Sequence, residues 1–241
     1  MSDSYRERPS GVVDGAVVWT RTAAEEPGRV LPDGCVDLLW MDGRLVVAGP
    51  DTRAHLPSQA PGDRCVGLRF APGTGPPLLG VPAHELRDRR VPLAELWPGR
   101  EVRRLTERLA DAPLPGRALE RLALERTRQA TGPYAYASRP YDPVAARTVE
   151  AMRAGRSVAA LAADVGLGER QLHRRCLAAF GYGPKTLARV LRMNRALESA
   201  RAGRPYAEVA AEAGYADQAH LAREVKALAG VPLGALLQGQ A

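Results

Sequence analysis

The sequence contains no run of apolar residues near the roughly 18 that a membrane-spanning helix needs. Its first residues, MSDSYRERPSG, also lack the apolar segment of a secretory signal peptide. We therefore expect a cytosolic protein, located in the cytoplasm. The 241 residues are enough for two modest domains, each with a core of its own.

Cysteine is scarce as well. Cys35, Cys65 and Cys176 are odd in number and far apart, and none belongs to a C-x-x-C pair. This pattern fits neither a disulfide framework nor a zinc site. We expect reduced thiols with a structural role.

The sequence also lacks the common motifs of enzymes. There is no G-x-S-x-G, no H-E-x-x-H, no P-loop and no dinucleotide-binding fingerprint, and His55 and His84 stand alone. Several aspartates between residues 33 and 51 lie near turns, where Asp serves the turn geometry. We expect no enzyme, no catalytic residue, no cofactor and no metal.

Lysine is nearly absent, and positive charge is unevenly distributed. Residues 143–241 carry 14 Lys and Arg against 8 Asp and Glu, whereas residues 1–142 carry 20 against 19. The formal net charge of +7 therefore comes almost entirely from the C-terminal part. A polyanion-binding surface is expected there.

β-forming residues dominate residues 11–70. GAVVWTRT, CVDLLWMDGRLVVAGP and RCVGLRFAPG predict strands, and Asp42-Gly43 lies where a type I′ hairpin turn is favoured. From about Pro82 onward, through HELRDRRVPLAEL, the apolar residues recur at helical spacing. We predict a β-rich domain with accessory helices over residues 1–128.

A segment without periodicity, QATGPYAYASRPYDP, follows and predicts a linker over residues 129–142. Residues 143–241 then read as short helices, with Ser157 as an N-cap and Gly166 and Gly181 as stops. The predicted fold class is a multidomain α+β protein, in which an all-α domain follows the β-rich domain.

One phrase of the helical domain occurs twice. LAADVGLGERQLHRR, residues 161–175, returns 48 residues later as VAAEAGYADQAHLAR, residues 209–223. In each copy a short helix meets a Gly-containing turn and a second helix follows, which is typical of a helix-turn-helix unit. The stretch from Pro184 to Gly203 predicts a long helix joining the two units.

The second helix of each copy has an outward face that suits DNA. In copy one, Leu172, Cys176, Ala179 and Phe180 form the predicted core face, and the outward residues are Arg170, His173 and Arg174. In copy two, the core face is Leu221, Val225 and Leu228, and the outward residues are Gln218, Ala219, His220 and Arg223. Arg can pair with guanine, Gln with adenine, and Ala can touch a thymine methyl group. The two copies differ most in these residues, which favours recognition of an asymmetric DNA sequence.

The residues from SVAALAADVGLGERQ to AGYADQAHLAREVKALAGVPLGAL resemble the DNA-binding domain of AraC/XylS-type transcription regulators over about 95 residues. The resemblance implies seven helices, two helix-turn-helix units joined by a long helix, and binding to promoter DNA. It places base contacts at the same seven outward residues, and RNA polymerase is an expected partner. Three residues depart from the family pattern: Gly168 where a Ser or Thr cap is usual, and Cys176 and Val225 where aromatics are common.

The N-terminal part carries a second resemblance. RVLPDGCVDLLW, VAGPDT, GLRFAPG and GVPAHELRD are similar to an uncharacterised domain that accompanies this DNA-binding domain in bacterial regulators. The resemblance implies a domain that senses a small-molecule effector or forms a homodimer. By analogy its fold is a cupin-like β-barrel. The residues expected to line an effector pocket are Trp19, Cys35, Trp40 and Arg69.

Two other functions stay open. Cys35 lies beside a turn and near arginine, which can lower the pKa of a thiol, so the chain could sense oxidants or electrophiles through this residue. An architectural protein that coats DNA without sequence preference is the other alternative, and it would show steep salt dependence. The different outward faces of the two copies argue against it.

Overall fold

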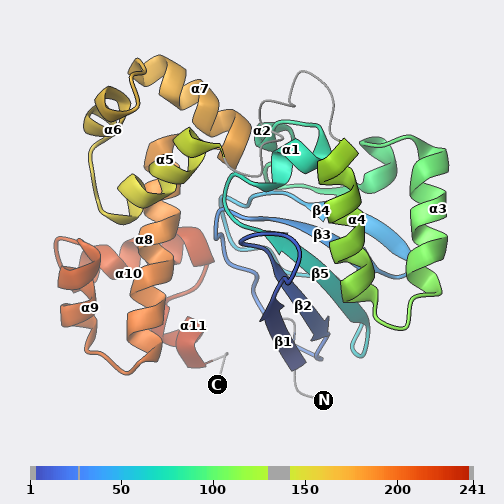
Figure 1. Cartoon of the computed structure of the whole chain (residues 1–241). Coiled ribbons are helices and arrows are strands. Elements are labelled where there is room, and N and C mark those ends of the chain that lie inside the picture. Colours follow the sequence, from blue (N-terminus) through green and yellow to red (C-terminus); the bar gives the residue numbers. More distant parts are fainter. Residues whose placement is uncertain (1–3, 27, 130–141, 239–241) are drawn as a thin grey trace.

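The computed structural model describes residues 4–26, 28–129 and 142–238, which form a β-sheet domain followed by a helical domain (Figure 1). The sheet is antiparallel, with the strand order β1-β2-β5-β3-β4-β6. Its strands are β1 (Ser4–Pro9), β2 (Val17–Thr22), β3 (Val36–Met41), β4 (Arg44–Ala48), β5 (Arg64–Phe70) and β6 (Arg90–Pro92).

The predicted hairpin is confirmed. Met41 pairs with Arg44, and the two turn residues between them have positive φ, 51° at Asp42 and 67° at Gly43. Positive φ at both central residues is what a type I′ turn requires, and its twist suits the flanking strands. The hairpin sets the register of β3 against β4.

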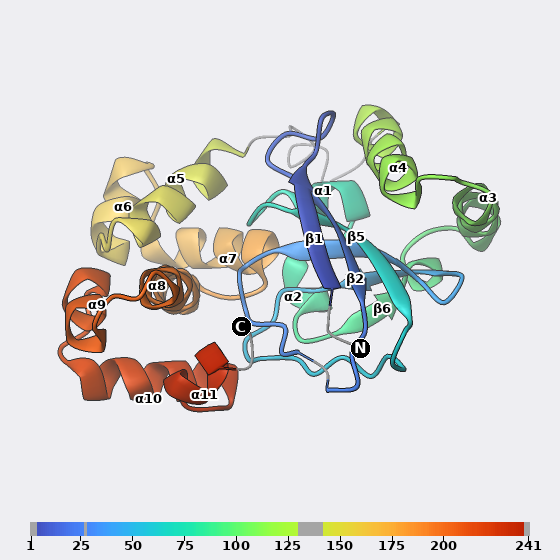
Figure 2. The same ribbon diagram turned by 90° about the horizontal axis from the view of Figure 1, so that it is seen from below.

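Helices cover one face of the sheet (Figure 2). They are α1 (Gly75–Leu79), α2 (Ala83–Leu86), α3 (Gly99–Ala110) and α4 (Pro115–Gln129), with a 3-10 turn at Leu93–Glu95. Alternate strand residues, among them Leu38, Val47 and Leu68, point to this face and pack with apolar residues of α3 and α4 in one core. The accessory helices of the prediction are therefore confirmed.

The cupin-like barrel is not what the described strands form. Their sheet is open, with β1 and β6 as its two edges. Its apolar face is covered by α1, α3 and α4, so a second sheet is not needed to bury that face.

The helical prediction between Pro82 and residue 95 was partly wrong. Helix α2 ends at Leu86, because Arg87 leaves the helical conformation with a ψ of 129° and Asp88 follows with a positive φ of 58°. The chain then turns back to the sheet, where Val91 of β6 pairs with Val47 of β4 and is buried. Tertiary pairing overrides the local helical spacing here.

The described part of the C-terminal domain contains the seven helices that the resemblance implies. They are α5 (Pro143–Arg153), α6 (Val158–Asp164), α7 (Glu169–Phe180), α8 (Pro184–Arg201), α9 (Tyr206–Ala213), α10 (Gln218–Ala229) and α11 (Leu233–Gln238). Each helix-turn-helix unit has its own core, and α8 contributes Leu187 and Val190 to the first and Met193 and Leu197 to the second. None of the described helices is long and apolar enough to cross a membrane.

Most of the predicted linker, residues 130–141, lies outside the described residues. The two domains nevertheless contact each other through described residues. Leu31 packs against the core of the second helix-turn-helix unit, and Asn194 of α8 donates a hydrogen bond of 2.9 Å to the carbonyl oxygen of Pro32. The backbone N–H of Ala54 donates to the carbonyl oxygen of Leu228 in α10 at 2.7 Å.

The first recognition helix, α7, also contacts the sheet domain, near α1 and α2 (Figure 1). Arg87 donates a hydrogen bond of 3.2 Å to the carbonyl oxygen of Gly181, the residue that ends α7. Both recognition helices therefore meet the N-terminal domain at their C-terminal ends.

Candidate nucleic-acid interface

The first unit consists of α6, a turn and α7. Ser157 caps α6 by accepting a hydrogen bond of 3.1 Å from the N–H of Ala160, and Gly166 turns the chain with a φ of 66°. Gly168 begins α7 without a side chain that could cap it, as its departure from the family pattern predicts. The side-chain oxygen of Gln171 compensates by accepting a hydrogen bond of 3.0 Å from the N–H of Gly168.

The predicted reading residues of α7 gather on one surface. Leu172, Cys176 and Phe180 face the core, and Ala179 is half-buried against it. Arg170, His173 and Arg174 are exposed and line a groove together with Glu169. The structure thus brings the three predicted residues together and adds one acidic neighbour.

The second unit consists of α9, a turn and α10. Asp217 caps α10, and its carboxylate accepts a hydrogen bond of 2.6 Å from the N–H of His220. Gln218, Ala219 and Arg223 are exposed, whereas Leu221, Val225 and Leu228 are buried as predicted.

His220 differs from the other predicted reading residues because its imidazole is used within the turn. It is half-buried, and its Nδ1 accepts a hydrogen bond of 3.3 Å from the N–H of Ala216. Its ring also meets the ring of Tyr215 edge-on, with centroids 5.3 Å apart. His220 therefore helps to shape the turn, and its other ring nitrogen, Nε2, is not used in that hydrogen bond.

The two recognition helices are not related by the 48-residue spacing of the repeated phrase. Helices α7 and α10 both have 12 residues and end in left-handed glycines, Gly181 and Gly230, which are 49 residues apart. The left-handed Gly166 lies three residues before the start of α7, whereas the left-handed Gly214 lies four residues before the start of α10. In this register Ala222, which is exposed, corresponds to His173. Sequence reasoning missed Ala222, and the helix-ending glycines are the signal that could have found it.

A cluster on α8 supports the second recognition helix. Arg189 donates to Glu224 of α10 through two nitrogens, at 2.9 and 3.1 Å, and holds the pKa of this carboxyl below its usual value. Arg192 also pairs with Glu224 at 3.6 Å, and its guanidinium lies 4.5 Å from the ring centroid of Tyr215. These contacts fix the rotation of α10 relative to α8.

Arg195 of α8 joins the two units. It donates to the carbonyl oxygens of Arg153, at the end of α5, and of Ala213, at the end of α9. Positive charge is favourable at helix C-termini, where carbonyl groups lack helical partners. One side chain therefore ties α5, which packs in the core of the first unit, and α9 of the second unit to the long helix, a role that sequence reasoning did not assign.

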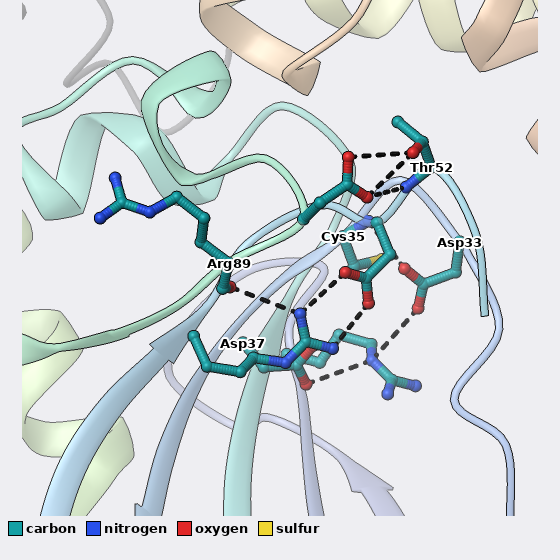
Figure 3. A network of polar contacts seen from close by, with 9 residues as sticks. Asp33, Cys35, Asp37, Thr52 and Arg89 are labelled. Atoms are coloured by element: carbon teal, nitrogen blue, oxygen red, sulfur yellow. Dashed lines mark hydrogen bonds and ion pairs between the residues drawn. The ribbon is translucent and has the colours of Figure 1, made fainter. Parts of the chain in front are cut away.

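The expected effector residues of the N-terminal domain do not form one group. Trp19 and Arg69 lie on the sheet face opposite the helices, where the indole N–H of Trp19 donates to Asp37 at 2.6 Å. The Nε of Arg69 lies 3.4 Å from Asp33 and 3.3 Å from Asp37 (Figure 3). Trp40 packs on the other face, against the main core. Side chains alternate between the two faces along β3, so Trp40 and Asp37 point to opposite faces of the sheet. Trp19 lies on the face of Asp37, and Trp40 therefore cannot share a pocket with it.

The charges in this cluster support one another. Burial alone would lower the pKa of Arg69, but Asp37 and Asp33 outweigh it and raise the pKa above its usual value. Burial raises the pKa of Asp37, and Arg69 opposes that effect. The arginine therefore stays charged between the two carboxylates.

The surroundings of Cys35 disfavour the thiol-sensor alternative. Burial of its sulfur, and then the charge of Asp33, raise the pKa of this thiol well above its usual value. The expected lowering by a nearby arginine is present but is outweighed. Within the described parts of the chain, no group of three or more His, Cys, Asp or Glu side chains could hold a metal ion.

Two family profiles match parts of the chain. Residues 161–239 match a helix-turn-helix domain, of the AraC type, and residues 14–92 match a domain of unknown function, DUF6597. Curated proteins give no match.

Among solved structures, the chain is similar to ToxT from Vibrio cholerae. An apo ToxT variant has 10% sequence identity and a TM-score of 0.49, and the match covers 98% of this chain and 100% of ToxT. A ToxT structure with bound unsaturated fatty acid has 10% identity and a TM-score of 0.46, with 92% and 94% of the two chains covered.

Proposed function

We propose that this chain, which carries an AraC-type helix-turn-helix domain at its C-terminus, is a sequence-specific transcription regulator. Its two recognition helices, α7 and α10, read promoter DNA in the major groove. The domains of the regulator are residues 1–128 for sensing or dimerisation, residues 129–142 as linker and residues 143–241 for DNA binding. It acts in the cytoplasm, with RNA polymerase as a partner, and it is not an enzyme.

One observation carries this proposal. The N-terminal domain contacts α7 and α10 near their C-terminal ends, at Gly181 and Leu228, and the N-terminal halves of both helices are exposed. Those halves carry different side chains, with Arg170 and Arg174 on α7 and Gln218 and Arg223 on α10. A scaffold that is used twice with two different exposed faces suits an asymmetric DNA site.

Selection from random DNA duplexes tests the proposal. The full chain should select one motif, and Arg174→Ala and Arg223→Ala should each lower specific affinity by about 1–3 kcal/mol and relax the preference at one position. Arg103→Ala is the matched control, because Arg103 is exposed on α3, on the side of the molecule far from the recognition helices (Figure 1).

The same experiment separates the architectural alternative. An architectural protein would yield no motif, and its binding would fall steeply with salt for every sequence equally. If a motif is found but both arginine variants bind it as tightly as the unchanged chain, the assigned reading face is wrong.

We further propose that the N-terminal domain responds to a small-molecule effector. The supporting observation is the cluster of Trp19, Asp37 and Arg69, in which the Nε of Arg69 lies 3.3 Å from Asp37 and 3.4 Å from Asp33. This Nε is buried and has no hydrogen-bond partner among the described residues, so the guanidinium keeps a donor that a ligand oxygen could accept from. Thermal-shift screening of small metabolites tests this idea, since a true ligand should stabilise the chain and Arg64→Gln but not Arg69→Gln.

The N-terminal domain also offers a surface for a homodimer. Strand β1 is an edge of the sheet, and all six of its residues, Ser4–Pro9, are exposed. An exposed edge strand presents unpaired backbone groups that a second chain can pair with. Sedimentation of the full chain and of a Tyr5→Pro variant tests this, because proline removes one of the backbone donors.

A further inference from the structure

The imidazole of His173 lies against Gly183, in the turn between α7 and α8. A Cβ added at Gly183 would be 2.5 Å from Cε1 and 2.7 Å from Nδ1 of His173, closer than real Cβ atoms come to other atoms. Gly183 is the N-cap of α8 and has a φ of −71° and a ψ of 166°, which any residue can adopt. The backbone does not require glycine here, but a larger residue would have to displace the exposed ring of His173.

This contact orients the imidazole. The Nδ1 and Cε1 edge faces the turn, and Nε2 is the farthest of the three atoms from the added Cβ position, at 3.6 Å. His173 is nevertheless exposed and lines the same groove as Arg170 and Arg174. The ring is therefore backed by the turn and offers one nitrogen, Nε2, to whatever enters the groove.

The second unit shows the opposite pair of residue sizes. In the register set by the helix-ending glycines, Ala222 corresponds to His173 and Pro232 corresponds to Gly183. The first unit combines a large side chain with glycine, whereas the second combines a small side chain with proline. The space that accommodates a ring beside this turn is therefore found in the first unit and not in the second, so the fold does not require it.

We propose that Gly183 is a specificity-determining residue that acts through His173. By leaving room for the imidazole, Gly183 positions Nε2 so that it contacts one base pair in the major groove. A backed ring also loses less conformational freedom when DNA binds, which strengthens its contribution. Gly183 itself is a positioning residue and makes no base contact. This inference rests on the proposed function.

Gly183→Ala tests the proposal, with His173→Ala and the double variant beside it. A good base contact gives about 5-fold to 150-fold discrimination, which corresponds to the usual 1–3 kcal/mol. We expect both single variants to lose discrimination at the same base position and to keep it elsewhere. In the His173→Ala background, the alanine at 183 has no ring to displace and should cause no further change.

Gly234→Ala is the control for a glycine exchange in this domain. Gly234 lies within α11, and an added Cβ there would have nothing within 4 Å. This variant should select the same motif as the unchanged chain. Nitrogen NMR of the histidine rings, without DNA, gives a second measurement. Of the two glycine variants, Gly183→Ala should shift the ring resonances of His173, and Gly234→Ala should leave them unchanged.

The outcomes separate this proposal from the function on which it rests. If the unchanged chain selects no motif, the proposed function fails, whereas a motif that Gly183→Ala leaves intact overturns only the role of Gly183. An equal loss of affinity for all sequences, or an effect that persists without His173, also overturns it. If Gly183→Ala does not fold, the double variant should fold again. If the double variant also fails to fold, the packing of the His173 ring against Gly183 is not the reason for the glycine.

Discussion

Gly181→Ala tests the packing of the first recognition helix against the N-terminal domain. Gly181 ends α7 with a φ of 80°, a left-handed conformation that costs a residue with a Cβ about 1–2 kcal/mol. An added Cβ would also lie 2.6 Å from Cγ of Pro50 and 3.2 Å from the carbonyl oxygen of Ala83. Ordinary carbon contacts are about 3.5–4.0 Å, so the proline ring or the helix end has to move.

Gly203 provides a matched control. It follows α8 with a φ of 82°, and an added Cβ would have nothing within 4 Å. Gly203→Ala should therefore lower the free energy of unfolding by the backbone cost alone, about 1–2 kcal/mol. Gly181→Ala adds overpacking of about 1–3 kcal/mol, which brings its expected loss to about 2–5 kcal/mol.

Urea unfolding followed by two signals measures the difference. All three tryptophans, Trp19, Trp40 and Trp97, lie in the N-terminal domain, so fluorescence reports that domain, whereas circular dichroism reports mostly helices. Gly181→Ala should separate the two transitions, because it weakens the contact between the domains. Equal losses for the two variants, with the transitions still coincident, would refute the described packing.

Three further changes test the N-terminal domain. Glu120→Gln should lower the free energy of unfolding at pH 7 by about 1–3 kcal/mol, because Glu120 accepts two hydrogen bonds from Arg8, which hold its pKa below the usual value. The difference in free energy of unfolding between the unchanged chain and Glu120→Gln should shrink as the pH falls. The pKa of Glu120 is lower in the folded chain than in the unfolded chain, so its stabilising effect is complete above the unfolded pKa and is lost as the pH falls through the folded pKa. Denaturation at several pH values from pH 7 to pH 3 measures this. Gly67→Ala should move the indole of Trp19, whose Cε2 lies 2.2 Å from the added Cβ position, and the emission of Trp19 should shift, whereas Gly43→Ala, with open space around it, leaves it unchanged. Cys35 should react with iodoacetamide at neutral pH no faster in the folded chain than in urea, because its raised pKa leaves little thiolate, and fast labelling would revive the thiol-sensor alternative.

The sequence alone predicted those features that are stabilised by residues close to them in the chain. The Asp42-Gly43 turn, the N-cap at Ser157 and the apolar spacing of α7 and α10 all depend on neighbours a few residues away. Those features appear in the structure as predicted. The helix-turn-helix units were accessible from the sequence for this reason.

Two strands gave no usable signal because too few of their residues are buried. All six residues of β1 are exposed, so no apolar alternation marks it, and backbone pairing with β2 holds it in place. Strand β6 has only three residues, of which Val91 alone is buried. The spacing of apolar residues cannot identify elements that are held mainly by backbone pairing.

The candidate DNA surface shows a different limit. The sequence identified the exposed side chains of α7, but the register of α10 depends on one extra residue between Gly214 and the start of α10, which the repeated phrase conceals. The supporting arginines of α8 were also hidden, since Arg189 meets Glu224 across 35 residues of sequence. Such pairs are fixed by tertiary packing, and a single sequence does not reveal them.

The contacts of α8 give the N-terminal domain a route to both recognition helices. Arg195 ties the ends of α5 and α9 to α8, and the adjacent Asn194 holds the carbonyl oxygen of Pro32. Pro32 directly precedes Asp33, which pairs with Arg69 in the cluster where we place the effector. A ligand that moved Asp33 would therefore shift a segment bonded to the helix that holds the two units together. Regulation by this route would change the spacing of the two reading faces and leave their residues untouched.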